Sequence, residues 1–287
     1  MSTLELTDVA TPDYVLVGHV CRDVLGQTER PGGTVLYAGV TALRLGRRVG
    51  IVTSHGPDLV LPEELAEAQV INIFAPETTT FLHQHEPTGR VLTLTARAGN
   101  ITIADVPVAW RTAQIIHFAP VAWEVDRDVG PLHGASMLVA TPQGWLRRAT
   151  DTGNITPAIE RLASLPMEAL TAVVVSSEDV GEHEQLVAAI AARCPVVAVT
   201  RGPEGCTLYT GGVPAQIPSW AAHEADSTGA GDVFATAFFI RLSETGDPAI
   251  SARFAACVAA RSVEGEGVAR IPTRQQVEHE LAQRAPR

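Results

Sequence analysis

Short segments in which nearly every residue is apolar alternate with helical patterns along most of this chain. The clearest apolar segments are Ala172–Ser176 and Val196–Thr200, with a helical pattern at Glu182–Ala192 between them. A strand that is apolar on both sides has to be covered on both faces, which is typical of parallel sheets flanked by helices. The alternation therefore predicts an α/β fold, a three-layer sandwich with a mostly parallel central sheet.

The same alternation of strand and helix patterns extends toward both ends of the chain. Further strands are expected at 14–17, 49–53, 115–118, 137–140 and 206–210, and helices at 34–45, 62–68, 157–165, 233–242 and 249–263. Three consecutive strand patterns, at 70–74, 79–84 and 90–95, interrupt the alternation and predict a small projecting sheet. We expect one α/β domain over residues 1–287, with a small β lid drawn from about 24–36 and 70–100.

The composition excludes several classes of function. The net charge of −11 disfavours a nucleic-acid or membrane partner. All 21 basic residues are arginine, which excludes a lysine-dependent phosphate loop and lysine Schiff-base catalysis. The four cysteines form no C-x-x-C pair and are expected to be buried thiols of a cytoplasmic protein. The N-terminus lacks the pattern of a signal peptide, and no apolar run reaches the ~18 residues of a membrane span.

The stretch D-S-T-G-A-G-D, from Asp226 to Asp232, leads directly into an apolar helical pattern. Its glycines permit a tight turn, and the free amides at the start of a helix attract an anion. A carboxylate at Asp232 is placed to accept a proton from an alcohol that attacks a phosphoryl group held there. An ordinary capped turn without a ligand explains the same spacing and stays open as the alternative.

Another alternative comes from a second copy of part of this motif. Asp226-Ser-Thr-Gly and Asp151-Thr-Gly153 loosely resemble the paired loops of aspartic proteases. The first copy has an inserted residue, and neither copy lies in the all-β surroundings that such a pair requires, so this alternative is disfavoured.

Five segments together resemble the ribokinase-like (PfkB) sugar kinases. D-S-T-G-A-G-D-V-F at 226–234 is similar to the C-terminal signature of that family, D-T-x-G-A-G-D-x-F. Segments similar to its other motifs follow in the family's order, at 14–23, 32–46, 197–205 and 262–272. Because the motifs are collinear over nearly the whole chain, the sequence is identified as a member of this family, with its ribokinase-like fold.

The resemblance implies a role for each matching residue. It makes Asp232 the general base on the substrate hydroxyl. The anion hole around the transferred phosphate would consist of Gly229, Ala230 and Gly231. The substrate hydroxyls would be held by Asp23, Gly32 and Gly33.

The resemblance also implies a nucleotide site and cofactors. The residues along ATP would be Thr200, Gly202 and Gly205. Asp226 matches a position that some members link to a monovalent-cation loop, so the implied cofactors are ATP, Mg²⁺ and a monovalent cation such as K⁺.

Three departures from the family pattern bear on the substrate and the metal. Tyr37 stands where the N-terminal signature has Asn, which argues against ribose or a simple hexose and makes Tyr37 a candidate substrate-binding residue. Ser176-Ser-Glu-Asp179 replaces the magnesium-associated N-x-x-E, which leaves Asp179 to orient water on Mg²⁺. The segment T-P-Q-G-W-L-R at 141–147 resembles an inositol-kinase-like branch.

Several basic residues remain as weaker candidates. In a chain without lysine, Arg201 either pairs with ATP phosphates or stays on the surface. His83 and His85 alternate on a predicted strand and so share a face. A metal site there lacks a third ligand, which favours a solvent-facing or lid role. Arg90 and Arg97 either reach a phosphate or polyol from the lid or stay solvated.

The prediction is an ATP- and Mg²⁺-dependent kinase that phosphorylates a hydroxyl of a sugar, polyol or cyclitol. The alternatives are a non-catalytic or regulatory ligand-binding protein on a kinase fold and a nucleoside kinase of the same family. The expected partners are the small-molecule substrate and ATP. An exposed edge of the lid sheet predicts a homodimer.

Overall fold

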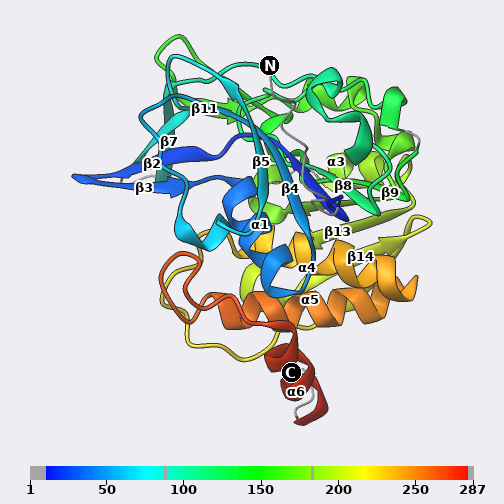
Figure 1. The fold of residues 1–287 in the computed structure, drawn as a ribbon. Helices are drawn as coiled ribbons and strands as arrows, with labels where there is room; N and C mark the ends of the chain where they lie inside the picture. The colour runs from blue at the N-terminus through cyan, green and yellow to red at the C-terminus, as the bar shows by residue number, and fades with distance from the viewer. Residues whose placement is uncertain (1–10, 87–88, 133, 182–183, 284–287) are drawn as a thin grey trace, which may run out of the picture.

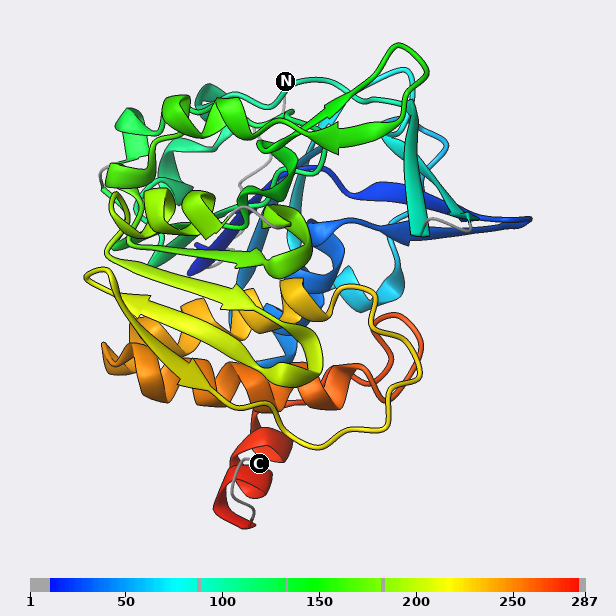
Figure 2. The same cartoon turned by 180° about the vertical axis from the view of Figure 1, so that it is seen from behind.

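A nine-stranded sheet is the main element of the computed structural model, which describes residues 11–86, 89–132, 134–181 and 184–283 (Figures 1 and 2). From edge to edge its strands are β15 (Val213–Ile217), β14 (Cys206–Thr210), β13 (Val196–Thr200), β12 (Ala172–Ser176), β9 (Met137–Ala140), β8 (Ile115–Phe118), β1 (Tyr14–Val17), β4 (Val49–His55) and β5 (Gln69–Phe74). The strands from β13 to β5 pair in parallel, whereas β14 and β15 are antiparallel.

Helices cover both faces of this sheet. One face packs against α1 (Thr34–Arg44), α4 (Ala230–Thr245) and α5 (Pro248–Ser262). The other face packs against α2 (Ser177–Val180), α3 (Glu184–Ala191) and several 3₁₀ turns. The C-terminal α6 (Arg274–Gln283) extends beyond α5 (Figure 1). Within the described residues, no helix has the length and apolar character needed to cross a membrane.

The packing of strand β1 on both faces of the sheet explains why its sequence is apolar throughout. Tyr14 and Leu16 point into the core beneath α1, α4 and α5, whereas Val15 and Val17 point into the core on the opposite face. All four side chains are fully buried. The expectation of a three-layer α/β sandwich with a mostly parallel sheet is therefore confirmed.

A second, four-stranded sheet projects from the main layer. Its order is β3 (Thr28–Gly32), β2 (Cys21–Leu25), β6 (Thr80–Glu86) and β7 (Gly89–Ala96). The β2–β3 hairpin forms the projecting tip (Figures 1 and 2). The assignment of 70–74 to this sheet was wrong, because β5 pairs in parallel with β4. The 56–68 connection is long enough for the crossover that parallel pairing requires.

Two expected helices are shorter than their patterns indicated. The segments 62–68 and 157–165 contain only the 3₁₀ turns Glu63–Leu65 and Ile159–Ser164. Pro166 disfavours helical backbone at Leu165 and so limits the second segment, whereas Pro62 and Pro157 stand at the first positions, where a helix tolerates proline. The short strands Arg147–Ala149 (β10) and Ile155–Pro157 (β11) form an antiparallel pair beside the small sheet.

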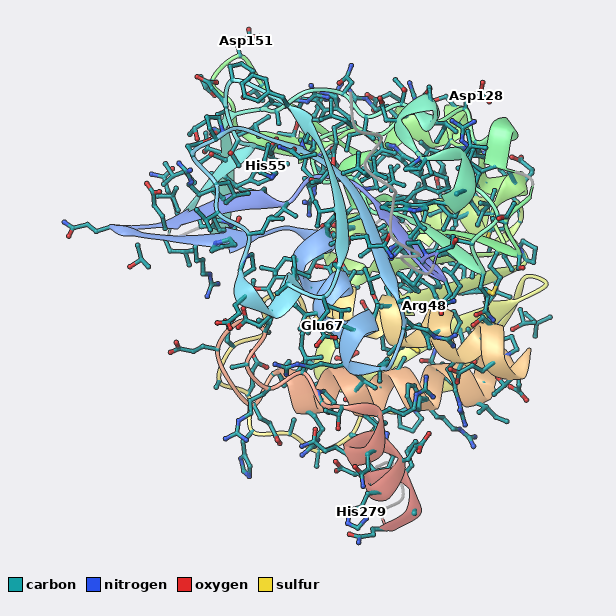
Figure 3. All side chains as sticks on the ribbon, viewed as in Figure 1. Arg48, His55, Glu67, Asp128, Asp151 and His279 are labelled. Atoms are coloured by element: carbon teal, nitrogen blue, oxygen red, sulfur yellow. The ribbon has the colours of Figure 1, made fainter. Side chains whose placement is uncertain are left out.

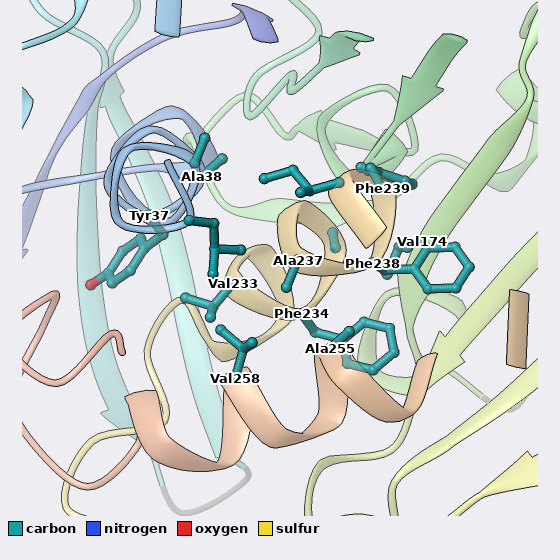
Figure 4. Close-up of a cluster of buried hydrophobic side chains, with 14 of the residues drawn as sticks. Tyr37, Ala38, Val174, Val233, Phe234, Ala237, Phe238, Phe239, Ala255 and Val258 are labelled. Atoms are coloured by element: carbon teal, nitrogen blue, oxygen red, sulfur yellow. The ribbon is translucent and has the colours of Figure 1, made fainter. Parts of the chain in front are cut away.

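Helix α4 lies between the sheet, α1 and α5, and its apolar side chains fill the space between them (Figure 4). Phe234 and Phe238 stack one helical turn apart, with ring centroids 6.1 Å apart. Both rings are buried. The position of α4 is therefore set by contacts on every side.

Removal of the Phe238 ring should destabilise the protein, because it leaves a cavity in the centre of this core. We expect Phe238→Ala to lower the free energy of unfolding by about 3–5 kcal/mol in urea denaturation. Phe74→Ala is the matched control, because that ring is 74% exposed at the end of β5. A loss of equal size in the two variants would contradict the packing described here.

Candidate active site

One large cleft of about 1360 Å³ lies where the carboxyl ends of β12 and β13 meet the small sheet and the start of α4. Open α/β sheets bind ligands at this edge. The cleft brings together most of the residues singled out in the sequence: Asp23, Gly33, Tyr37, Asp179, Thr200, Gly202, Gly205, Gly229, Ala230, Gly231 and Asp232.

The turn before α4 places Asp232 in the first turn of that helix. Gly229 is the N-cap residue, in the left-handed conformation with φ 75° and ψ 1°. The Val233 amide donates to the Gly229 carbonyl at 2.9 Å, so the helical ladder begins there. The amides at the start of a helix point out along its axis, and the helix dipole adds positive potential. Gly229, Ala230 and Gly231 therefore line the cleft as a candidate anion-binding nest beside a carboxylate, although the Ala230 amide also donates to the Ser227 carbonyl at 3.2 Å.

The Tyr37 ring packs against the turn at Gly229. A Cβ atom on Gly229 would lie 2.2 Å from the Tyr37 ring, so only glycine fits at that position. Tyr37 is 3% exposed, and its hydroxyl points away from the apolar cluster around α4 (Figure 4). Burial raises the pKa of this hydroxyl. The Tyr37 ring therefore contributes packing against the Gly229 turn.

The carboxyl group of Asp232 has an unusual protonation equilibrium. Burial is the main cause and raises its pKa to about 7, and the nearby Asp179 and Asp23 act in the same direction. A hydrogen bond from Thr34 and the charge of Arg147 oppose this shift. A carboxylate with a pKa near neutrality is suited to accept a proton and release it again.

Thr34 connects Asp232 to the loop before β10. The Gln143 side-chain amide donates to Thr34 Oγ1 at 2.8 Å. Because that oxygen accepts from an amide N–H, the hydroxyl proton of Thr34 is left for Asp232. Thr34 is fully buried at the start of α1. Gln143 thereby orients the hydroxyl that favours the charged form of Asp232.

The small sheet supplies a second carboxylate to the cleft. Asp23 on β2 is 6% exposed and bonded to His83 Nε2 through Oδ1, at 2.9 Å. A Cβ on Gly32 would lie 2.1 Å from Asp23 Oδ2, so glycine on β3 lets this carboxylate pack against the backbone. Gly33 has φ 87° and begins the turn into α1. This end of the cleft can accept hydrogen bonds from hydroxyl groups.

Asp179 lies at the start of the short helix α2, across the cleft from the nest. It forms a capping box with Ser176, whose Oγ donates to Asp179 Oδ2 at 2.9 Å. Arg147 Nη2 donates to Asp179 Oδ1 at 3.0 Å. Arg147 therefore brings a positive charge to the part of the cleft that also holds Asp232.

A divalent metal at this place would depend on the bound phosphates. In the part of the chain that the structure describes, no three His, Cys, Asp or Glu side chains are grouped to hold an ion. Mg²⁺ commonly takes only one or two protein carboxylates and keeps waters and phosphate oxygens as its other ligands. Asp179, which lines the cleft, fits that limited role.

The other end of the cleft is lined by small residues. Gly202 and Gly205 flank a 3₁₀ turn after β13, and Gly205 has φ 91° with the Ile217 carbonyl in the place of any Cβ. Thr200 lies just before this turn. Opposite it, α5 presents only alanine side chains and the C-cap valine: Ala256, Ala259, Ala260 and Val263. These small side chains line a slot at this end of the cleft.

Three predicted site residues, Gly32, Arg201 and Asp226, lie outside the cleft lining. Arg201 is exposed, and its Nε donates to Thr207 Oγ1 at 3.0 Å on β14. Asp226 accepts from the Thr228 amide at 2.9 Å, the Gly267 amide at 3.0 Å and Arg30 Nη1 at 3.3 Å. Burial alone would raise the pKa of Asp226, but these hydrogen bonds and the Arg30 charge hold it below its usual value.

The remaining candidate residues also differ in whether they line the cleft. His83 faces the cleft, whereas the side chains of His85 and Arg90 lie outside the described part of the chain. Arg97 donates to the Ala122 carbonyl at 2.9 Å and lies over the Trp123 ring.

The aspartic-protease alternative finds no support in the fold. Asp151 lies on an exposed turn between β10 and β11 (Figure 3), whereas Asp226 is bonded to Arg30 and Gly267. The described structure therefore does not bring the two motifs together as a pair of carboxylates.

Four residues at or beside the cleft escaped the sequence analysis as site residues: Arg30, Thr34, Gln143 and Arg147. Gln143 and Arg147 belong to the T-P-Q-G-W-L-R segment, which was noted as a motif without roles for its side chains. Thr34 follows the glycine pair at 32–33, and that position was the available signal. Arg30 has no signal in the sequence, because its partners are nearly 200 residues away.

Comparison with known proteins finds similarity to kinases. Residues 167–274 match the model of the pfkB family carbohydrate kinases. A cytidine kinase of Thermococcus kodakarensis is 27% identical over 257 residues, which cover 80% of this chain and 88% of that protein. A ribokinase of Bacillus subtilis is 38% identical over 85 residues, 29% of each chain.

Solved structures share the fold over almost the whole chain. A pyrophosphate-dependent kinase in the ribokinase family, complexed with a pyrophosphate analog and myo-inositol, has a TM-score of 0.74 at 20% identity and covers 93% of this chain and 99% of its own. Arabidopsis thaliana ribokinase complexed with ribose and ATP has a TM-score of 0.73 at 19% identity and covers 96% and 100%. The chain thus has the ribokinase-like fold, and its residues 167–274 match the PfkB carbohydrate kinase family.

Proposed function

We propose that the protein is a kinase that transfers the terminal phosphoryl group of ATP to a hydroxyl of a sugar, polyol or cyclitol. One observation carries the proposal: Asp232, a carboxyl group with a pKa of about 7, adjoins the Gly229–Gly231 nest in a cleft that also contains Asp23. These are a base, an anion site and an acceptor site for hydroxyl groups.

The proposed reaction uses each group at a defined atom. Asp23 and its partner His83 hold hydroxyls of the acceptor. Asp232 accepts the proton of the attacking hydroxyl as its oxygen forms a bond to the γ-phosphorus. The bond between that phosphorus and the β–γ bridging oxygen breaks, and ADP leaves. The nest amides and Arg147 stabilise negative charge on the transferred group.

The proposed cofactors follow from the same cleft. Mg²⁺, when bound with the nucleotide, neutralises phosphate charge, and Asp179 would hold it through water. A monovalent cation near Asp226 remains part of the proposal from the family pattern. The alanine-lined slot beside Thr200, Gly202 and Gly205 supports a nucleotide, because a flat base fits where side chains are small.

A nucleoside is the second candidate acceptor. The similarity to a cytidine kinase over 80% of the chain favours it. So does the apolar wall of Phe81, Leu92 and Ile155 near Asp23, against which a base can pack. A panel of sugars, inositols and nucleosides, with ATP consumption as the measurement, separates these acceptors. Tight binding of one compound without turnover of any would instead favour a regulatory binding protein.

The cellular location and the oligomeric state are further parts of the proposal. The four cysteines are buried free thiols, which supports a reducing, cytoplasmic environment. A homodimer through the small sheet is tested by light scattering of the purified protein.

The base is tested by Asp232→Asn. We expect kcat to fall by about 10²–10⁴-fold, because the amide cannot accept the proton. The variant should fold.

The Asp232 pKa lies above its unfolded value, so its contribution to stability is present below pH ~4 and lost as pH rises through ~7. Asp232→Asn should therefore raise Tm more at pH 8 than at pH 5. Near-normal turnover by the folded variant would contradict the mechanism.

The hydrogen bond from Thr34 is tested by the pH dependence of kcat. In the wild type, kcat should rise with pH and level off above about 7, as Asp232 loses its proton. Thr34→Val removes the donor that favours the carboxylate, so its midpoint should lie at higher pH. Thr34→Ser retains the hydroxyl and is the control. Identical midpoints for the valine variant and the wild type would argue against this hydrogen bond.

The donor is tested by a substitution that fills the slot. Ala259→Leu should raise KM for ATP about tenfold or more, because the base loses its space. Ala249→Leu, at the exposed start of the same helix, is the matched control. Kinetics are measured with ATP and with pyrophosphate as alternative donors. Turnover with pyrophosphate alone, unaffected by Ala259→Leu, would exclude a nucleotide donor.

A further inference from the structure

Arg30 lies on the small sheet directly opposite the candidate acceptor-binding carboxylate. In the antiparallel β2–β3 pair, Arg30 is in register with Asp23. Residues that are paired in this way project from the same face of a sheet. Asp23 faces the cleft, so Arg30 projects toward the same side.

The guanidinium group of Arg30 crosses from the small sheet to the turn before α4. Its Nη1 donates to Asp226 Oδ2 at 3.3 Å, and its Nη2 donates to Thr228 Oγ1 at 3.2 Å. Thr228 directly precedes Gly229, the N-cap residue of the nest. One side chain therefore joins the projecting sheet to the anion-binding turn.

Asp226 extends this connection to a third segment. Its Oδ1 accepts from the Thr228 amide at 2.9 Å, which shapes the turn, and its Oδ2 accepts from the Gly267 amide at 3.0 Å. Gly267 belongs to the loop between α5 and α6. The small sheet, the nest and that loop thus meet at one carboxylate.

The ion pair is sheltered from water. The side chain of Arg30 is 30% exposed and that of Asp226 is 16% exposed, so solvent screens their attraction less than that of a surface pair. The Tyr37 ring, packed against Gly229, closes the turn on its inner side. The contact therefore lies directly beside Thr228 and Gly229, which line the cleft.

We propose that Arg30 is a positioning residue, which holds the β2–β3 hairpin against the 226–231 turn so that the acceptor site at Asp23 and the phosphate nest keep one spacing. This proposal rests on the proposed kinase function. Asp23 and Arg30 are cross-strand partners, so movement of the hairpin changes the acceptor site and its attachment to the nest together.

The Arg30 contact would affect whether the γ-phosphoryl group of ATP passes to the acceptor or to water. Loss of the attachment lets the hairpin separate from the turn and admits water beside Asp232. A water oxygen then bonds to the γ-phosphorus, its proton passes to Asp232, and the bond to the bridging oxygen breaks to release ADP and inorganic phosphate. A loosened hairpin thereby shifts turnover from transfer toward hydrolysis.

Four variants test the proposal: Arg30→Ala, Arg30→Lys, Asp226→Asn and the control Arg48→Ala. The Arg48–Asp13 pair has the same N···O distance of 3.3 Å, but the Arg48 side chain is 58% exposed and lies outside the cleft lining. The first measurement is amide hydrogen exchange of residues 227–231 and 265–268 without ligand. The second is the ratio of inorganic phosphate to phosphorylated acceptor, with ATP and the acceptor found in the panel.

Arg30→Ala and Asp226→Asn should speed exchange of these amides about tenfold and raise the phosphate-to-product ratio by a similar factor. Arg30→Lys retains the charge and should recover part of the coupling, and Arg48→Ala should match the wild type. Unchanged exchange and an unchanged ratio in Arg30→Ala would overturn the proposal while leaving the kinase function intact. Faster exchange in a protein that phosphorylates no acceptor would instead retain the attachment and refute the kinase function.

Discussion

Burial of α4 on every side is the constraint on which the site depends. The helix packs against the sheet, α1 and α5, so it cannot shift without opening the core on its own face of the sheet. Its first turn is consequently held at the cleft, where the nest amides and the Asp232 carboxylate face a potential ligand. The chemistry at one end of α4 is thus supported by the apolar contacts along its length.

The same packing produces the protonation behaviour of Asp232. Burial and the neighbouring carboxylates raise its pKa, whereas Thr34 and Arg147 limit the rise. A carboxyl group left without these two partners would retain its proton more strongly, and one left in water would be a weaker base. Residues from α1, β10 and α2 therefore tune one functional group on α4.

Much of the fold was accessible from local patterns. Fully apolar strands such as Val196–Thr200 indicated a sheet covered on both faces, and the helices at α1, α4 and α5 were expected nearly where they occur. The errors lie where local pattern and tertiary pairing diverge. β5 has the same short-strand pattern as β6 and β7, yet it joins the main sheet. Two expected helices are 3₁₀ turns in the structure, and β15 and α6 were missed.

The sequence by itself determined the fold class and the glycine turn that ends in Asp232, because the apolar pattern of a strand and the residues of a turn are local features of the chain. Only the tertiary structure decided which side chains surround that turn. Arg30 reaches Asp226 across 196 positions, Gln143 reaches Thr34 across 109, and Arg201 contacts Thr207 outside the cleft lining. Such contacts depend on how distant segments pack in space, and no periodicity or spacing along the chain records that packing.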